Sequence, residues 1–279
     1  MQPSIELMSV AGIQTEVRRW GEGPPLLYLH PGDGLAKENE FLAALARHYQ
    51  VIAPSHPGFG NSLRPDDFKT MEDLAYFYLD FMAQENLVGV TMAGSSFGGW
   101  VALEIAIRSS ARLAQIILID TVGVRFSERD KADITDVYML SDAEIIENSY
   151  FDVARGKFDI ANATDEELLI VSRNRVALCQ YAWSPYMHNP RMKRWLHRVD
   201  VPTLVLWGAQ DRIVSVEYGQ RVAAAISDAN FKMIEEAGHY PHIEKPKETV
   251  DAILAFSKNA GKEKVSRSLD FGTLKTALA

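Results

Sequence analysis

Three residues of this sequence carry the side chains that acyl transfer needs, and each follows a short apolar run. Ser96 is the central residue of a Gly-Ser-Ser-Phe-Gly motif, whereas Asp211 and His239 follow two later runs. A hydroxyl can attack a carbonyl carbon when an imidazole accepts its proton and a carboxylate orients the imidazole. The three residues therefore predict a nucleophile, an acid and a base, provided that the fold brings them together.

The residues around Ser96 predict a sharp turn between a strand and a helix. The apolar run 88–93 precedes the motif, and helical spacing of apolar residues over 100–108 follows it. This is the order of a nucleophile elbow, in which the serine has a strained backbone at the tip of a strand. A Cβ atom at Gly94 or Gly98 would collide with the neighbouring strand or helix, so both positions need glycine.

The rest of the sequence alternates between short apolar runs and helical patterns, as in a parallel sheet enclosed by helices. The expected buried strands are 26–29, 50–54, 88–93, 115–119, 203–207 and 231–234, and the expected helices are 40–49, 71–85, 98–109, 216–226 and 247–258. Residues 4–10 and 13–19 alternate in polarity, which predicts an opening β-hairpin. The predicted fold class is α/β, with a mostly parallel twisted sheet and helices on both faces.

Residues 124–199 interrupt this alternation, because they contain helical patterns and many aromatic residues but no run typical of a buried strand. We interpret them as a helical lid inserted into a core formed by residues 1–123 and 200–258. The polar residues 259–279 are expected to form a loosely held C-terminal tail.

The elbow at Ser96 and the chain order serine, aspartate, histidine resemble the α/β-hydrolase family over about residues 20–258. The resemblance implies Ser96 as nucleophile, Asp211 as the acid in the loop after the penultimate strand, and His239 as the base after the last strand. Asp120 ends the strand before the insertion and is the minority choice for the acid. His30 and His56 are expected to be hydrogen-bonded structural histidines.

The segment His30-Pro31-Gly32-Asp33-Gly34 resembles the oxyanion loop of the same family, with proline where glycine is usual. Proline has no N–H group and cannot donate to an oxyanion. The expected donors are the backbone N–H of Phe97 and that of Gly32 or Asp33. The Asp33 carboxylate would oppose a developing oxyanion unless it points away or is itself paired.

The resemblance implies a hydrolase that works in two half-reactions, and a carboxylic ester of small or medium size is the first choice of substrate. The alternative is a carbon–carbon hydrolase of ring-fission products, because residues 164–169 followed by Arg173 and Arg175 resemble the lid of those enzymes. This chain has Ser95 and Tyr240 where those enzymes usually carry asparagine and tryptophan. A non-catalytic binding protein on the same fold is a minor alternative, since such proteins usually lose a triad residue.

The substrate is expected to be a small molecule with an apolar or aromatic portion. The candidate binding residues are Arg173, Arg175, Trp183 and Tyr240, and further aromatic residues of the insertion are Tyr138, Tyr150, Phe151, Tyr181, Tyr186 and Trp195. An arginine could hold a substrate carboxylate through two parallel hydrogen bonds.

Composition excludes several other classes of protein. The 37 acidic and 29 basic residues give a net charge of −8, which disfavours nucleic acid as a partner. Cys179 is the single cysteine, so neither a disulfide nor a thiolate zinc site is expected, and no metal-ligand or dinucleotide-binding spacing implies a cofactor. No secretion signal or membrane-spanning run of roughly 20 apolar residues is present, which favours the cytoplasm. The sequence does not determine the oligomeric state.

Overall fold

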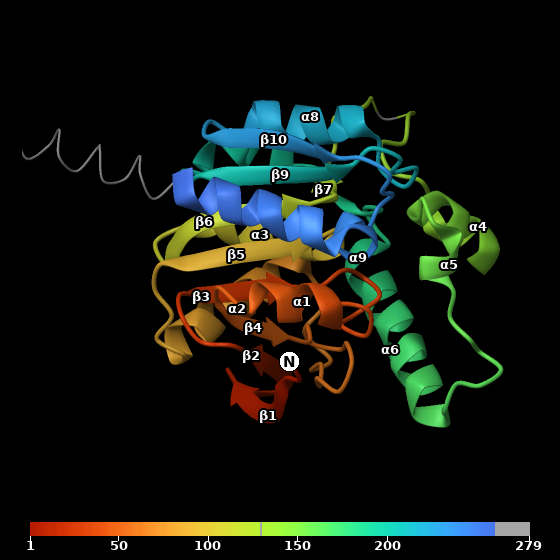
Figure 1. Cartoon of the computed structure of the whole chain (residues 1–279), viewed down its shortest axis with the longest axis horizontal. Helices are drawn as coiled ribbons and strands as arrows, with labels where there is room; N and C mark the ends of the chain where they lie inside the picture. Colours follow the sequence, from red (N-terminus) through yellow and green to blue (C-terminus); the bar gives the residue numbers. More distant parts are fainter. Residues whose placement is uncertain (129, 260–279) are drawn as a thin grey trace, which may run out of the picture.

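The computed structural model describes residues 1–128 and 130–259, and its centre is a sheet of eight strands (Figure 1). The strands lie in the order β1-β2-β4-β3-β5-β6-β9-β10. Their bounds are β1 Ser4–Val10, β2 Ile13–Trp20, β3 Pro25–Leu29, β4 Gln50–Pro54, β5 Val90–Ser95, β6 Leu113–Ile119, β9 Thr203–Gly208 and β10 Ala229–Ile234. Pairing is antiparallel from β1 to β4 and parallel from β4 to β10. The predicted opening hairpin and mostly parallel sheet are confirmed.

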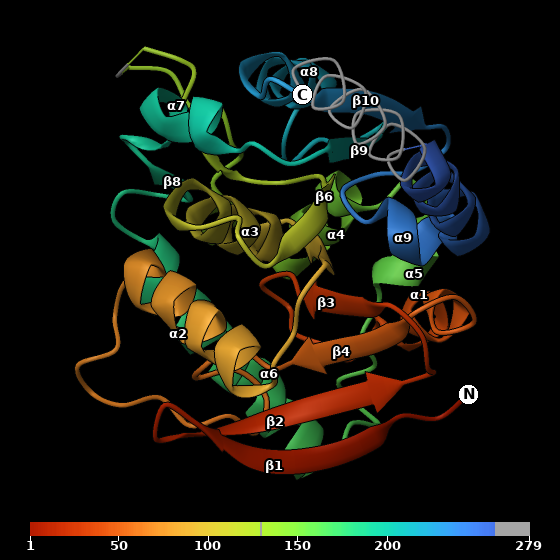
Figure 2. The ribbon, with the colours of Figure 1, turned by 90° about the vertical axis from the view of Figure 1, so that its left-hand side faces the viewer.

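Helices cover both faces of the sheet because the central strands are apolar on both sides (Figure 2). Helices α2 (Met71–Gln84), α3 (Phe97–Arg108) and α8 (Val216–Ala225) pack on one face. Helix α1 (Asn39–Leu45) and the helix over residues 246–259 pack on the other face. In β6, for example, Ile116 and Leu118 contact the first helix layer, whereas Ile117 and Ile119 contact the second.

Two expected strands differ from those observed. The strand predicted at 88–93 begins at Val90, because Val88 is exposed and Gly89 has a positive φ of 64°. The sequence predicted that the strand at 231–234 would be buried on both faces, but β10 is partly exposed. It is the last strand of the sheet, and Met233 near its end is 40% exposed.

Residues 124–199 follow β6 and include a group of helices beyond the edge at which the parallel strands end (Figure 1). They contain α4 (Asp142–Ser149), α5 (Val153–Gly156), α6 (Asp165–Ala182), α7 (Met192–Trp195) and the short 3-10 helices Val137–Met139 and Leu196–Arg198. A two-residue strand, β8 (His188–Asn189), pairs with β7 (Gly123–Val124). Of the expected C-terminal tail, residues 260–279 lie outside the described residues.

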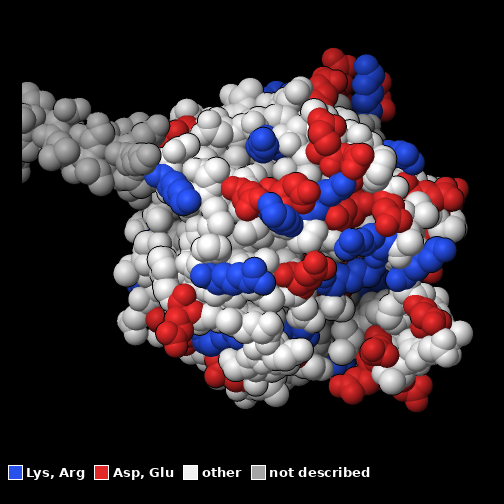
Figure 3. All heavy atoms as spheres, in the orientation of Figure 1, with Lys and Arg blue, Asp and Glu red and all other residues white. Residues whose placement is uncertain are grey.

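Charged side chains of both signs are interspersed on the face shown in Figure 3. The pairs Lys245–Glu236 and Lys247–Asp251 each have a nitrogen–oxygen distance of 2.7 Å. The net negative charge is therefore not collected into one acidic patch on this face. No helix within residues 1–128 and 130–259 is long and apolar enough to cross a membrane.

Substitution of Gly98 tests whether β3 and α3 must pack with their backbones in contact. A Cβ atom at this position would overlap the backbone carbonyl oxygen of Leu29. We expect Gly98→Ala to lower the free energy of unfolding by about 3 kcal/mol, the upper end for overpacking a core. Gly89→Ala is the control, because Gly89 has a positive φ but open space around it, so only about 1 kcal/mol of backbone strain is expected. Equal losses in urea titrations would contradict this account.

Candidate active site

Ser96 lies at a strained turn between β5 and α3. Its φ of 51° and ψ of −115° lie outside the regions that residues with a side chain usually adopt. Its N–H donates to the carbonyl of Ile119 on β6 at 2.8 Å, and α3 begins at the next residue. The turn therefore holds the Ser96 hydroxyl at the tip of the central strand, above the amino end of a helix.

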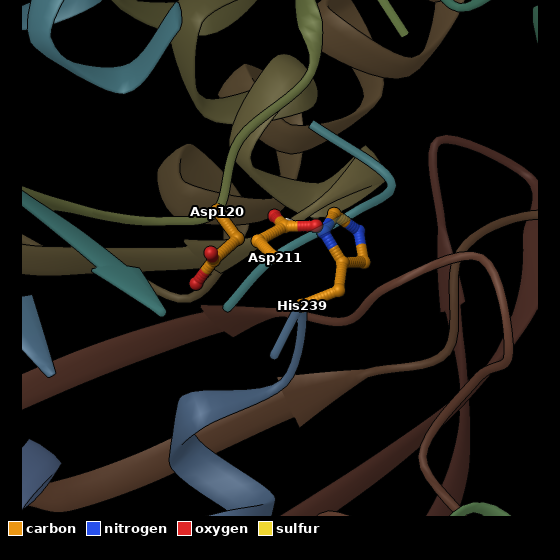
Figure 4. Close-up of side chains that lie close together, drawn as sticks. All are labelled: Asp120, Asp211 and His239. Carbon is orange, nitrogen blue, oxygen red and sulfur yellow. Dashed lines mark hydrogen bonds and ion pairs between the residues drawn. The ribbon is translucent and has the colours of Figure 1, made fainter. Parts of the chain in front are cut away.

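The structure brings Ser96, His239 and Asp211 together in one hydrogen-bonded series. His239 Nε2 lies 2.8 Å from Ser96 Oγ, and His239 Nδ1 lies 2.8 Å from Asp211 Oδ2. Because an aspartate oxygen accepts from Nδ1–H, Nε2 is free to accept the proton of the hydroxyl. Figure 4 shows the Asp211 carboxylate against the imidazole.

Backbone groups fix the Asp211 carboxylate from its other side. Asp211 Oδ1 accepts from the N–H groups of Ile213 and Val214 at 2.8 and 2.9 Å. Both oxygens of the carboxylate are thus engaged within a buried loop, which orients the imidazole.

The loop of His239 is held by residues that the sequence analysis did not single out. The N–H of His239 donates to the carbonyl of Ser149 at 2.7 Å. Glu244, which ends the short helix α9 (Pro241–Glu244), accepts from Gly238 N at 2.6 Å and from Asp152 N at 2.7 Å. These contacts join residues 238–244 to residues 149–152, and no local pattern in the sequence indicates them.

The candidate oxyanion donors are backbone N–H groups at the start of α3 and in the loop that follows β3. The N–H of Phe97 is the first of α3, and neither it nor the N–H of Gly32 has an acceptor within the described residues. The Asp33 carboxylate, which would oppose an oxyanion, accepts a hydrogen bond of 3.0 Å from the hydroxyl of Tyr240. Asp33 is therefore paired, as the sequence analysis required.

Asp120, the minority choice for the acid, is not the carboxylate that binds His239 Nδ1. The carboxylate at hydrogen-bond distance from His239 Nδ1 is that of Asp211. Asp120 is fully buried behind it, where Oδ1 accepts from Gly208 N at 2.9 Å. Burial and, next, the Asp211 charge raise the pKa of the Asp120 carboxyl well above its usual range.

The model of the alpha/beta hydrolase family matches residues 26–252 of this chain. The chain belongs to the α/β-hydrolase family. With 27% identity over 265 residues and 89% of each chain covered, this α/β hydrolase is similar to the 2-hydroxy-6-oxo-6-(2'-aminophenyl)hexa-2,4-dienoic acid hydrolase of Metapseudomonas resinovorans. The 2-hydroxymuconate semialdehyde hydrolase of Pseudomonas sp. (strain CF600) is 29% identical over 252 residues, covering 84% of this chain and 87% of the relative.

A solved structure titled as a serine hydrolase involved in carbazole degradation has a TM-score of 0.75 to this α/β hydrolase. It is 26% identical in sequence, and the match covers 92% of this chain and 99% of the solved one. The relatives together with the family model show that the chain is a hydrolase.

Three of the candidate substrate-binding residues of this α/β hydrolase are not brought to Ser96. Arg175 pairs with Asp142 at 2.7 Å with 65% of its side chain exposed. Arg173 is exposed and reaches the carbonyl of Gly60 at 3.4 Å, and Trp183 is 56% exposed. Tyr240, the fourth, is buried with its ring centroid 5.0 Å from that of His239.

Asn174 takes the inward position on α6, between the two arginines. It is buried, its Oδ1 accepts from Gly60 N at 2.9 Å, and its Nδ2 donates to the carbonyl of Asp33 at 2.8 Å. Neighbouring helical residues differ by about 100° in direction, so Arg173 and Arg175 cannot share the buried stripe of Asn174, Ala177 and Tyr181. The spacing of that stripe is a sequence signal that could have found Asn174.

His30 and His56 have the structural role that was expected, since both are fully buried and hydrogen-bonded. His56 Nε2 faces the carbonyl of His30 at 3.0 Å, and the N–H of His56 donates to His30 Nε2 at 2.9 Å. Burial lowers the pKa of His56 to about 3 and that of His30 well below its usual value. Both imidazoles are therefore neutral in this α/β hydrolase at physiological pH.

The contrast between Asn174 and Arg173 can be measured as stability. We expect Asn174→Ala to lower the free energy of unfolding by about 2–3 kcal/mol, because it leaves two backbone groups without their partner. Arg173→Ala, one residue away on the same helix, should change it by less than about 0.5 kcal/mol. Chemical denaturation of both variants measures these free energies of unfolding. A larger loss for Arg173→Ala than for Asn174→Ala would refute this assignment of the helix faces.

Proposed function

We propose that this α/β hydrolase cleaves a carbon–carbon bond in a conjugated keto acid of the kind produced by aromatic ring fission. In this proposal Ser96 is the nucleophile, His239 the general base and Asp211 the acid that orients it. The single observation that carries the chemistry is the hydrogen-bonded series of these three side chains, with 2.8 Å at each link.

The first half-reaction uses the groups around Ser96. The Ser96 oxygen adds to the ketone carbon while His239 Nε2 takes the hydroxyl proton, and the carbonyl oxygen becomes an oxyanion. The free N–H groups of Phe97 and Gly32 are the proposed donors to that oxyanion. Pro31 cannot take part, because it lacks an N–H group.

The bond that breaks next depends on the leaving group. When the tetrahedral oxyanion collapses and re-forms the C=O bond, the electron pair of the carbon–carbon bond moves onto the leaving carbon, where a conjugated carbonyl delocalises it. That carbon accepts the proton from His239, and an acyl-enzyme remains on Ser96. Water, deprotonated by His239, then releases the carboxylic acid and restores the hydroxyl.

The names of the relatives support cleavage of a carbon–carbon bond in a conjugated acid. Those compared above are named as hydrolases of a hexadienoic acid and of a muconate semialdehyde, and each is similar to this chain over more than four-fifths of its length. They do not favour the ester that the sequence analysis placed first.

An ester remains the second candidate, and the lid geometry supports it. Neither Arg173 nor Arg175 lies at the triad, and residues 164–167 act as a capping box that starts α6. A capping box is a general helix signal, so this part of the lid resemblance carries no information on substrate. An ester needs no partner for a carboxylate.

Lys37 is our candidate for holding the carboxylate of a keto acid. It is half-buried on the segment that follows the oxyanion loop, and its Nζ donates to Tyr150 Oη at 3.3 Å and to the carbonyl of Gly156 at 2.8 Å. The ring of Tyr150 lies 5.1 Å from that of Tyr240, which is next to His239. No carboxylate of the described residues lies within 4.0 Å of the ammonium, and a third N–H remains available.

Ser96→Ala and Asp211→Asn test the chemistry. Each is expected to lower kcat by about 10⁴-fold, the usual loss for a triad member, without unfolding the chain. Turnover should be measured on a 2-hydroxy-6-oxo dienoate and on p-nitrophenyl esters of increasing acyl length, with circular dichroism as the folding control. Normal turnover by pure Ser96→Ala would end the serine mechanism. Cleavage of the esters but not of the dienoate would replace the proposed bond by an ester.

Lys37→Met tests the carboxylate partner. A charge-assisted hydrogen bond is worth about 1.5–3 kcal/mol, so kcat/KM for the dienoate should fall roughly ten- to a hundredfold. Neutral esters should be nearly unaffected, which separates loss of the charge from loosening of residues 150–156. Arg173→Ala is the matched control and should leave both substrates unchanged. An equal loss on acidic and neutral substrates would show that Lys37 only supports the local structure.

A further inference from the structure

Asp120 is a buried carboxyl group that the proposed mechanism does not use. It follows the end of β6 directly, is fully buried and has a positive φ of 43°. Its Oδ1 accepts from Gly208 N at 2.9 Å, but no donor of the described residues faces its Oδ2. An ionised carboxylate with one oxygen unsatisfied in the interior is costly, so this oxygen needs a proton or a donor.

The described residues around Asp120 supply negative charge, and no ion pair among them includes Asp120. Oxygens of Asp120 and Asp211 and a nitrogen of His239 all lie within 4.8 Å of one another (Figure 4). Glu244, on α9, is buried, accepts from the N–H of Gly238 and adds a further nearby carboxylate. Burial and, next, the charge of Asp211 raise the pKa of Asp120 well above its usual range, although the hydrogen bond from Gly208 lowers it.

We propose that Asp120 is a positioning residue that stays protonated and donates a hydrogen bond from Oδ2 to Asp211. This inference rests on the proposed function, because it assigns Asp120 to the support of a catalytic Asp211. Protonation gives Oδ2 the partner that it otherwise lacks, while Oδ1 keeps its bond from Gly208. Asp120 and Asp211 then share one negative charge.

The protonation state of Asp120 matters to His239. A second full negative charge within about 5 Å of the imidazole would favour the protonated imidazolium, which cannot accept the proton of Ser96. A neutral donor instead holds the Asp211 carboxylate in place without that charge.

Asparagine is a close isostere for the proposed state. Its amide oxygen can accept from Gly208 N, its NH₂ can donate to Asp211, and asparagine tolerates a positive φ better than most residues. Asp120→Asn therefore preserves both hydrogen bonds without a titratable group, whereas Asp120→Leu removes both.

The test is the rate at which a fluorophosphonate labels Ser96 as a function of pH. The serine oxygen displaces fluoride from phosphorus, so the rate follows deprotonation of His239 and does not depend on the natural substrate. We expect Asp120→Asn to keep the midpoint of the pH profile and to label within about threefold of the wild-type rate, because both hydrogen bonds remain. Asp120→Leu should label about tenfold more slowly.

Two labelling results would overturn the inference. A midpoint that falls by about 1–3 units in Asp120→Asn would show that Asp120 is charged in the wild type. A folded Asp120→Leu that labels at the wild-type rate would show that Asp120 positions nothing. Wild-type protein that fails to label at all would instead refute the proposed function.

Infrared spectroscopy reads the proton on Asp120 without any reaction, and it decides the question if either variant fails to fold. Wild-type protein labelled with ¹³C-aspartate should show the C=O stretch of a protonated carboxylic acid at neutral pH, shifted by the isotope. Absence of that band would overturn the inference.

Discussion

The close approach of three backbone segments at Ser96 is the constraint on which the site depends. Gly98 of α3 packs against the carbonyl of Leu29 on β3, and Gly94 of β5 packs against the backbone of α3, with no side chain between them. This contact stabilises the strained φ of Ser96, which would otherwise relax. The candidate oxyanion donors follow from the same contact, because it places the start of α3 beside the loop that leaves β3.

Three buried carboxyl groups lie at the site: Asp120 and Asp211 near the imidazole of His239, and Glu244 on the backbone of its loop. Asp211 is satisfied by His239 and two backbone N–H groups, and Glu244 by two backbone N–H groups. Asp120 accepts one such bond and stands nearest to Asp211. Because backbone donors differ in number from one acid to the next, chemically similar side chains can be held in different protonation states a few ångströms apart.

Residues 124–199 contribute to the site in two ways. Ser149 and the N–H of Asp152 hold the loop of His239, and Asn174 joins the loop of Asp33 to the loop of Gly60. The attack on a carbonyl is common to esters and to conjugated ketones, so contacts from this segment, rather than the triad, would choose the substrate. Lys37 lies against the same segment, which connects substrate choice to the packing of residues 150–156.

The sequence by itself determined the fold class and most strand positions, since strands such as Gln50–Pro54 are continuous apolar runs that only a doubly covered sheet can bury. It also identified the residue types and the order of the proposed triad, because each residue follows a strand end. Their catalytic roles stay predictions. Only the tertiary structure decided which acid meets His239, that Arg173 faces outward, and that Asn174 and Glu244 hold the loops. These contacts join residues far apart in the chain. Spacing along α6 can indicate its buried face, because neighbouring residues differ by about 100° in direction, but it cannot indicate which distant groups Asn174 binds.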